Sequence, residues 1–436
     1  MTKSVVLKKN DEIRVLVISV NSFSKTNNNG KTIASFFKDF KEENIAQLYL
    51  YPEYPDGAIK CDYFNITESN LIKKFFGNNI TNEVKYVESN QVLSSRTNSL
   101  YNFNIKNMQF LRFLRDTLWT TNLWESEELF NWIENFKPDC IFYSGLNNYG
   151  MIKMVRKIAD KYKLPVVVYA TDDYFLPVFS LSVFRAIRRR LLVNEMKKLL
   201  SGHSKLVVIN EYMKETYDVL FSQDCDILVN LSVPNSLGSQ AVIIREKIKL
   251  SYFGNLNWNR DKVIGKLAKW LDKSSLKDVF EIEVYSSSPK KRQIENITVG
   301  NVCSYKGFLN SEQLYSKMNE SDVLLFAESF DYYSRVGTKL SLSTKITEYL
   351  YLNRPILAIG PKDIGSIRFL QDNTDNVIIN TLEDKEIYEK LNVIMNEKSR
   401  QSIAQKNKMF ISSYMDKMND NSLHKIINCL FEEGER

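Results

Sequence analysis

The stretch "LSTKITEYLYLNRPILAIG", which runs from Leu342 to Gly360, contains the pattern that decides the fold. Its first half has the apolar spacing of a helix from about Ser343 to Tyr351. Its second half, 356–359, is a short apolar run of the kind that forms a buried strand in a parallel sheet. A helix that leads into a buried strand is the repeating unit of a doubly wound α/β domain.

The same alternation extends along the whole chain. Upstream of this stretch we expect strands at 248–253, 280–285 and 323–326 and helices at 263–271 and 311–318. The first half of the chain predicts strands at 13–20, 45–51, 140–143, 166–169, 206–209 and 227–229 and helices at 31–41, 129–136, 151–162 and 213–221. After residue 359 the periodicity is mainly helical. Two such series predict an α/β protein with two doubly wound Rossmann-like domains facing a ligand cleft.

The boundary between the two series is a turn-rich segment at 231–245, which we interpret as a linker. We therefore expect an N-terminal domain over 1–232 and a C-terminal domain over 245–415. A last helix at about 416–436 is expected to pack back on the first domain. A chain of 436 residues is long enough to form two such hydrophobic cores.

Composition excludes several kinds of chemistry. The five cysteines occur singly and the chain has only two histidines, which argues against a disulfide scaffold, a metal site and histidine-based catalysis. A net charge of +7 is too small over this length to indicate a nucleic-acid-binding protein. No apolar run approaches the ~18 residues of a membrane span, and the N-terminal apolar core is too short for a signal peptide. We expect a cytoplasmic protein.

Two charged residues of the quoted stretch are candidates for ligand binding. Ser343 or Thr344 can cap the predicted helix, which places Lys345 in its first turn. A cation there is unfavourable for the helix dipole, so we expect Lys345 to meet an anion. Glu348 follows three residues later and shares the same helix face. The alternative is an ordinary surface ion pair.

The loop before the first long helix is another candidate. Gly30-Lys31-Thr32 matches the end of a P-loop, but the position that needs the earlier glycine is Lys25. A polar loop at a helix N-terminus still offers backbone N–H groups to a diphosphate. Gly30 is therefore either part of a ligand loop or part of an ordinary helix start.

Several segments together resemble a known family. "STKITEYLYLNRPILAIG" resembles the S-x-K-x-x-E-Y-L-x-x-x-x-P-I-L segment of retaining, nucleotide-sugar-dependent glycosyltransferases of the GT-B fold, specifically family 4. Tyr252-Phe-Gly-Asn-Leu256 with Arg260 behind it, "YKGFLNSEQLYSKMNESDVLLF" and "FKPDCIFYSG" resemble other family segments in the same order. The resemblance covers most of the chain.

The resemblance implies a donor sugar nucleotide, with UDP or GDP as its nucleotide, bound mainly by the second domain. It implies that Glu348 accepts hydrogen bonds from the ribose hydroxyls and that Arg260 and Lys345 hold the diphosphate without a metal ion or other cofactor. With Gly30 from the loop described above, the expected donor-binding residues are Gly30, Gly254, Asn255, Arg260, Ser343, Thr344, Lys345 and Glu348.

Two positions depart from the family pattern. The family often has a second glutamate eight residues before Glu348, where this chain has Leu340, so recognition of the donor sugar stays open. The family also commonly has a histidine in the first domain where this chain has Thr171-Asp172-Asp173. We interpret Asp172 and Asp173 as candidates that orient an acceptor hydroxyl or stabilise positive charge at the sugar. The alternative is that one of them only caps the next segment.

A basic run at 181–200 is the remaining unusual feature. It has six basic residues and one acid, Glu195, and the part from Arg185 to Lys198 could lie on anionic lipid at the inner face of the plasma membrane. Because Arg188 and Glu195 fall in the apolar sector of the predicted helix, a solvated or cleft-facing helix is the alternative.

The leading hypothesis is a retaining hexosyltransferase that acts on a hydroxyl of a glycan or lipid-linked glycan in bacterial cell-surface polysaccharide synthesis. A catalytically silent glycosyltransferase-like partner subunit and a nucleotide-sugar epimerase of the same fold are the alternatives. An epimerase needs more acid–base side chains, histidines included, than this chain has.

Overall fold

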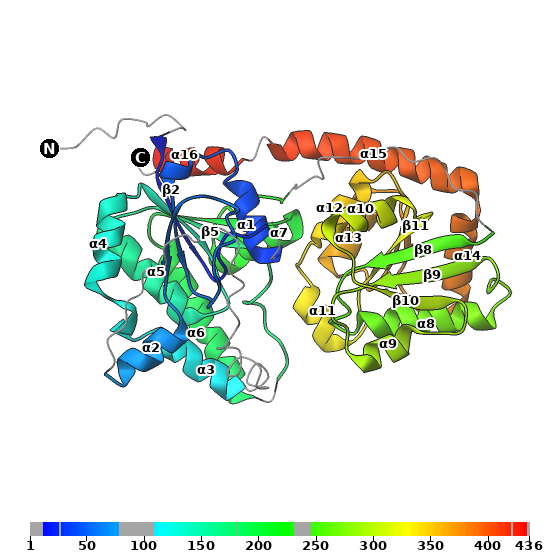
Figure 1. The fold of residues 1–436 in the computed structure, drawn as a ribbon, viewed down its shortest axis with the longest axis horizontal. Helices are drawn as coiled ribbons and strands as arrows, with labels where there is room; N and C mark the ends of the chain where they lie inside the picture. The colour runs from blue at the N-terminus through cyan, green and yellow to red at the C-terminus, as the bar shows by residue number, and fades with distance from the viewer. Residues whose placement is uncertain are drawn as a thin grey trace. The chain divides into compact units, whose positions relative to one another are not determined.

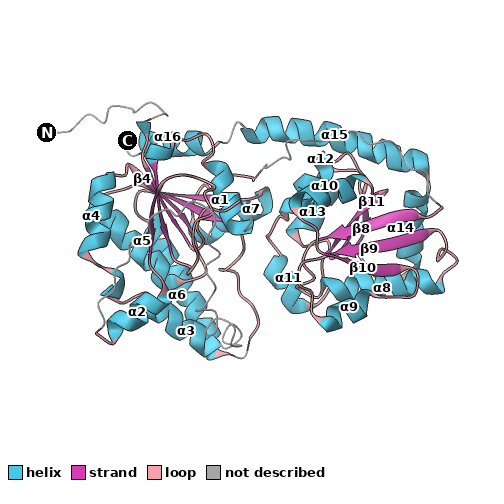
Figure 2. Cartoon of the chain, viewed as in Figure 1, coloured by secondary structure: helices cyan, strands magenta, loops and turns pink. Residues whose placement is uncertain are grey.

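A computed structural model describes residues 12–25, 28–77, 109–180, 182–230, 246–419 and 422–433. The chain divides into two compact units: unit 1 comprises Met1–Asn230 and Asp420–Arg436, and unit 2 comprises Leu231–Asn419. Figure 1 and Figure 2 show that each unit is built on its own sheet, with helices on both sides of it. The predicted linker at 231–245 lies outside the described residues.

The described strands of unit 1 form a seven-stranded parallel sheet in the order β3-β2-β1-β4-β5-β6-β7. The strands are β1 (Val15–Ser19), β2 (Ile45–Tyr49), β3 (Asp62–Asn65), β4 (Cys140–Ser144), β5 (Val166–Ala170), β6 (Ser204–Val208) and β7 (Asp226–Ile227). The helices are α1 (Asn28–Phe36), α2 (Glu68–Phe75), α3 (Gln109–Leu118), α4 (Glu127–Phe136), α5 (Tyr149–Tyr162), α6 (Val183–Leu200), α7 (Glu211–Phe221) and α16 (Leu423–Glu433), with short 3-10 turns at Glu42–Asn44 and Asn122–Trp124.

The described strands of unit 2 form a six-stranded parallel sheet in the order β10-β9-β8-β11-β12-β13. The strands are β8 (Ile248–Phe253), β9 (Phe280–Tyr285), β10 (Cys303–Gly307), β11 (Val323–Ala327), β12 (Ile356–Ile359) and β13 (Val377–Ile379). The helices are α8 (Arg260–Lys273), α9 (Lys291–Ile297), α10 (Ser311–Asn319), α11 (Tyr332–Thr338), α12 (Thr344–Tyr351), α13 (Gly365–Asn373), α14 (Asp384–Met395) and α15 (Glu397–Asn419).

Central strands in both sheets are buried over their whole length, as the apolar runs predicted. β1, β2, β5 and β11 have five buried residues each. This is the expected state of a parallel sheet whose two faces are covered by helices. The prediction of an α/β fold with two doubly wound sheets is confirmed.

The last helix, α16, packs on the rest of unit 1 through contacts of both histidines of the chain. His203 Nε2 donates to the carbonyl oxygen of Leu430 at 2.6 Å. The ring of His424 stacks on Phe40, with 3.7 Å between ring centroids. In this protein the histidines hold a helix in place.

Some boundaries differ from the sequence predictions. Strands β3, β10 and β13 were missed: β3 and β10 contain polar residues and are partly exposed, and β13 has only three residues. The first helix spans Asn28–Phe36 and not 31–41, because residues 37 to 40 form a turn with an N–H of Phe40 donating to the oxygen of Phe37. Helix α8 starts at Arg260, three residues earlier than predicted, which brings this residue to a helix N-terminus.

Candidate functional site

The candidate site of unit 2 lies where its strand order reverses. The chain passes from β8 to β9 and β10 on one side, and then returns to β11 on the other side of β8. In open α/β sheets such a switch point lies at the carboxyl ends of the strands and is where ligands bind. Gly254 and Asn255 follow β8 here, and Glu328 follows β11.

An ion pair joins these two strand ends. Arg260 donates from Nε to Glu328 Oε2 at 3.3 Å and from Nη2 to Oε1 at 2.8 Å. Its Nη1 donates to Asn255 Oδ1 at 3.2 Å. The side chain of Glu328 is 2% exposed and that of Arg260 is 15% exposed. The pair therefore fixes Arg260 at the carboxyl ends of β8 and β11 and leaves a small part of its side chain accessible.

The electrostatics of this pair follow from its burial. Burial disfavours the charged guanidinium, but the carboxylate of Glu328 outweighs this effect and raises the pKa of Arg260. Arg260 therefore stays charged. The sequence predicted it as a cation available to a diphosphate and did not single out Glu328, which binds it from 68 positions away. An acid directly after the buried strand β11 was the signal that could have revealed Glu328.

The turn before α8 is held by a second carboxylate. Trp258 and Asn259 both have positive φ angles, 59° and 56°, which is uncommon for residues other than glycine. Asn259 Nδ2 donates to Asp331 Oδ2 at 2.9 Å, and Asp331 caps α11 by accepting from the N–H of Ser334. The strained turn is thus tied to the loop after β11, and it positions Arg260.

Lys345 lies over Gly254. A Cβ atom built on Gly254 would be 3.0 Å from Lys345 Cε, so a larger residue would displace the lysine. Helix α12 is held against β8 by Tyr349, one turn after Lys345, whose hydroxyl accepts from the N–H of Phe253 at 3.2 Å. The structure therefore brings together four predicted residues, namely Gly254, Asn255, Arg260 and Lys345.

Glu348 also lies on α12 and has an unusual environment. Its Oε2 atom is buried and has no hydrogen-bond partner among the residues that the structure describes. Tyr315 of α10 is near: burial raises the pKa of Tyr315 to about 12, and the charge of Glu348 adds to the effect. A buried carboxylate oxygen without a partner is costly, so a donor from a ligand is the natural way to satisfy it. Leu340, the position of the missing family glutamate, is 5% exposed.

The start of α12 differs in one detail from the prediction. Ser343 occupies the N-cap position, but its side chain makes no capping hydrogen bond, and Thr344 is the first helical residue. The N–H of Ser343 donates to Ser366 Oγ at 3.0 Å. The predicted N-cap position at Ser343 is therefore right, but its side chain does not make the hydrogen bond of a cap.

The predicted aspartates of unit 1 have different surroundings from each other. Asp173 Oδ1 accepts from the N–H groups of Phe175 and Leu176, at 3.0 and 3.1 Å, and from the hydroxyl of Tyr217 at 2.9 Å. Asp172 is exposed and accepts from the hydroxyl of Tyr174 at 3.2 Å. Asp173 thus has the capping contacts that the sequence left open as an alternative, and Asp172 has a solvent-facing carboxylate.

Side chains of unit 1 already accept from several N–H groups of the described part of the loop after β1. The N–H of Ser22 donates to Glu53 at 2.7 Å, that of Phe23 to Gln47 at 2.9 Å and that of Lys25 to Asp56 at 2.7 Å. Gly30 lies inside α1, where a Cβ would come within 2.3 Å of the Ser22 carbonyl oxygen. Gly30 is thus closely packed, which favours the alternative of an ordinary helix start, and its role in donor binding stays a prediction.

Two further properties concern only the described residues. No group of three or more His, Cys, Asp and Glu side chains there is arranged to hold a metal ion. Nor does any helix in these ranges combine the length and the apolar character needed to cross a membrane.

Comparisons with known proteins give structural matches only. No protein-family model matches the sequence, and no curated protein sequence matches it significantly. The apo structure of the lipopolysaccharide outer core galactosyltransferase WaaB is 13% identical and matches with a TM-score of 0.54 over 95% of this chain and 99% of that chain. TarM is 11% identical, with a TM-score of 0.59 over 97% and 100%. A trehalose-6-phosphate structure from E. coli with bound UDP-2-fluoro glucose is 10% identical, with a TM-score of 0.57 over 92% and 95%.

At these low sequence identities the structural matches establish likeness of fold. The likeness extends over nearly the whole length of each chain. Both units take part in it, with sheets of seven and six parallel strands among the described residues. The chain therefore has the GT-B fold, the two-unit α/β architecture of these glycosyltransferase structures.

Proposed function

We propose that this protein is a glycosyltransferase that moves a sugar from a nucleotide donor to a hydroxyl group of an acceptor. The GT-B fold supports this proposal, since a galactosyltransferase and a protein with a bound UDP-sugar analogue share it. Fold alone does not define function, so the residues at the β8–β11 switch point have to support the proposal as well.

The observation that carries the proposal is the buried Oε2 of Glu348, which has no hydrogen-bond partner in the part of the chain that the structure describes. It lies on the same helix as Lys345, whose side chain crosses Gly254 at the end of β8. A nucleoside diphosphate has the complementary groups: ribose hydroxyls can donate to Glu348, and phosphate oxygens can accept from Lys345 and Arg260. Thr344, at the start of α12, would bring its backbone N–H to the same phosphates, and Ser343, whose N–H already donates to Ser366 Oγ, would offer its hydroxyl. UDP or GDP is the proposed nucleotide.

The proposed chemistry is transfer with retention and without a metal ion or other cofactor. As the bond to the sugar breaks, negative charge develops on the departing diphosphate. Arg260 and Lys345, near the carboxyl end of β8, can stabilise this charge. The leaving phosphate can then help to deprotonate the acceptor hydroxyl on the same face of the sugar. Asp172 is the proposed acceptor-side residue because its carboxylate is exposed.

A glycan or a lipid-linked glycan is the proposed acceptor, and assembly of a bacterial cell-surface polysaccharide in the cytoplasm is the proposed role. The WaaB structure supports this class, since its protein is a lipopolysaccharide galactosyltransferase.

A thermal-shift screen of UDP, GDP, ADP and CMP sugars tests donor binding. A donor at 100 times its dissociation constant should stabilise the fold by ~2.7 kcal/mol. Glu348→Gln should weaken binding of that donor by ~1.5 to 3 kcal/mol, because a charged hydrogen bond is lost. Glu389→Gln is the matched control, since Glu389 is an exposed residue of α14 in the same unit.

Three results would count against the proposal. Equal donor affinity for Glu348→Gln and Glu389→Gln in calorimetry would remove Glu348 from the site. Donor binding without hydrolysis or transfer to any acceptor would favour the silent partner subunit. Release of an epimerised nucleotide sugar would favour the epimerase.

A further inference from the structure

Helices α3 and α6 of unit 1 expose an unusual number of large apolar side chains. Phe110 and Leu114 on α3 are 44% and 45% exposed, and Val183, Phe184 and Ile187 in the first turns of α6 are 67%, 39% and 42% exposed. We refer to these five residues as the α3–α6 surface. Scattered single apolar residues are normal on a protein surface, whereas a connected group of this kind marks an interaction site.

The α3–α6 surface is continuous across the two helices. The rings of Phe110 and Phe184 lie 5.0 Å apart, and Phe113 lies 5.8 Å from Phe184 on the inner side. Phe110 and Leu114 are four positions apart, as are Val183 and Ile187, so each pair lies on one side of its helix. The five residues therefore form one patch.

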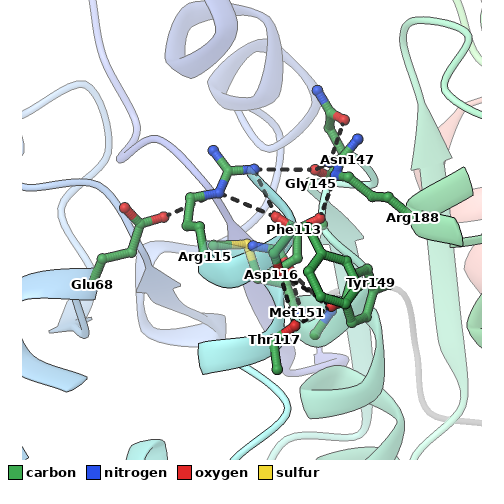
Figure 3. Close-up of polar contacts among 12 residues, drawn as sticks. Glu68, Phe113, Arg115, Asp116, Thr117, Gly145, Asn147, Tyr149, Met151 and Arg188 are labelled. Carbon is green, nitrogen blue, oxygen red and sulfur yellow. Dashed lines mark hydrogen bonds and ion pairs between the residues drawn. The ribbon is translucent and has the colours of Figure 1, made fainter. Parts of the chain in front are cut away.

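A buried network below the patch holds the two helices together. Figure 3 shows Arg115 of α3 and Arg188 of α6 both reaching Asp116. Arg188 Nε donates to Asp116 Oδ2 at 2.6 Å and its Nη2 donates to Asn147 Oδ1 at 2.8 Å. Arg115 also lies 3.6 Å from Glu68 of α2. The patch is thus presented by helices whose relative position is fixed by hydrogen bonds.

The charge around the patch is positive. Helix α3 and residues 183–190 carry six arginines and a single acid, Asp116, whose side chain is fully buried. The acid of the second half of α6, Glu195, is also buried and lies within 3.2 Å of Arg156 and 2.7 Å of Lys198. Burial lowers the pKa of Arg112, and the positive charges of Arg188, Arg115 and Arg185 lower it further. An anion at this surface would relieve that repulsion.

This combination favours one kind of partner. A second copy of the chain would bring two positive surfaces together around a twofold axis, which like-charge repulsion opposes. A bilayer with anionic lipids offers both an apolar layer and a layer of phosphates at the required depth. Apolar side chains flanked by arginines are the side chains that such an interface accommodates.

We propose that the α3–α6 surface docks on an anionic lipid membrane, with its five apolar side chains in the interfacial layer and Arg112, Arg185 and Arg190 at the phosphates. This differs from attachment through the whole basic run at 185–198. Arg188 is only 8% exposed and serves the buried network, and Lys198 is paired with Glu195. The proposal does not depend on the activity of the protein.

Vesicle flotation of the full chain tests the proposal with two matched pairs of variants. Vesicles of phosphatidylglycerol and phosphatidylcholine are compared with pure phosphatidylcholine at 0.1 M and 1 M salt. Arg185→Glu with Arg190→Glu should lower binding to anionic vesicles at least about tenfold, since each basic residue near the membrane surface contributes to the electrostatic attraction of the protein. Lys266→Glu with Lys269→Glu changes the net charge equally on α8 of unit 2 and should leave binding unchanged.

The second pair tests the apolar part. Val183→Asp should abolish flotation, whereas Val219→Asp, on α7 and 83% exposed, should not. Circular dichroism melting of each variant confirms that it is folded. The proposal is overturned if the parent protein does not float with anionic vesicles at 0.1 M salt, or if both charge-reversal variants lose binding equally. It is also overturned if light scattering shows a dimer that Val183→Asp dissociates, because the patch would then be a protein interface.

Discussion

Among the described residues, both units bury an arginine–carboxylate pair, and the two pairs differ in what surrounds them. In unit 2, Arg260 pairs with Glu328, whose side chain is 2% exposed, and its remaining contact is to Asn255 beside Gly254 and Lys345. In unit 1, Arg188 pairs with a fully buried Asp116, which also accepts from Arg115.

The difference separates a ligand site from a structural clamp. A buried ion pair is by itself weak evidence for either role, because desolvation opposes the attraction between the charges. The unit 1 pair joins α3, α6 and the loop after β4 (Figure 3). The unit 2 pair lies at a strand switch point beside a second cation. Four sets of variants can break or sharpen this contrast.

The largest effect is expected from Asp116→Ala. Removal of this carboxylate leaves Arg188 buried without its counter-ion, which should lower the free energy of unfolding by ~3 to 5 kcal/mol. Urea unfolding monitored by fluorescence measures the loss, with Asp39→Ala, an exposed aspartate of unit 1, as the control. A loss below ~1 kcal/mol would mean that the unit 1 pair is not a structural clamp.

Loss of either proposed cation should affect catalysis. Arg260→Ala and Lys345→Ala should each raise the activation barrier by ~2.7 to 4 kcal/mol, with a smaller effect on donor binding. Because Arg260→Ala also leaves Glu328 unpaired, the double variant Arg260→Met with Glu328→Gln is needed: it should restore stability and not kcat. Rates with and without EDTA complete the test. Activity that EDTA abolishes and Mn²⁺ restores would replace the cationic clamp with a metal ion.

The two aspartates after β5 should behave differently from each other. Asp173→Ala removes the acceptor of three hydrogen bonds and should destabilise unit 1 by ~1 to 3 kcal/mol. Asp172→Ala should leave stability within ~0.5 kcal/mol, because this side chain is exposed, and should lower the transfer rate while donor affinity is kept. Transfer at the parent rate by Asp172→Ala would exclude its proposed role.

The smallest effect concerns pH. Burial opposes ionisation of Asp331, but hydrogen bonds from Ser329, Ser334 and Asn259 outweigh it and hold its pKa well below the ordinary value. Its stabilising contribution is therefore present above an unfolded-state pKa of ~3.9 and is lost as the pH falls towards the native pKa. Burial instead raises the pKa of Asp173, so its contribution is largest below the unfolded pKa and declines as the pH rises.

Asparagine variants test this opposition. Asp331→Asn keeps a good N-cap and loses only the charge, which should cost ~0.3 to 1 kcal/mol at pH 7. Its unfolding free energy should also vary less between pH 5 and pH 3 than that of the parent, whereas Asp173→Asn should change the pH dependence in the opposite sense. Parallel pH curves for both variants and the parent would show that neither pKa is shifted.

The local pattern was sufficient for most of the architecture. Short apolar runs identified β8 and β9 with their observed boundaries, and the apolar spacing identified α12 to within one residue. Helix geometry also placed Lys345 and Glu348 on one helix face. The pattern failed at β10 and β13, because a partly exposed strand and a three-residue strand lack a clear period.

The candidate site was only half predictable. Gly254, Asn255, Arg260 and Lys345 were singled out from the sequence and lie together at the end of β8. Gly30 has no room for a Cβ atom next to Ser22. No sequence pattern distinguishes such a closely packed glycine from one that contacts a phosphate. Glu328 was missed because its partner is 68 residues away.

The sequence by itself determined the alternation of strands and helices and the faces of individual helices, because both depend on residues within a few positions of each other. Tertiary structure decided which charges meet. Arg260 finds Glu328, Arg188 finds Asp116 across 72 positions, and Asp173 finds Tyr217 across 44. These contacts depend on strand order and helix packing, which local periodicity does not encode, and the surroundings of each contact then distinguish a ligand site from a structural clamp.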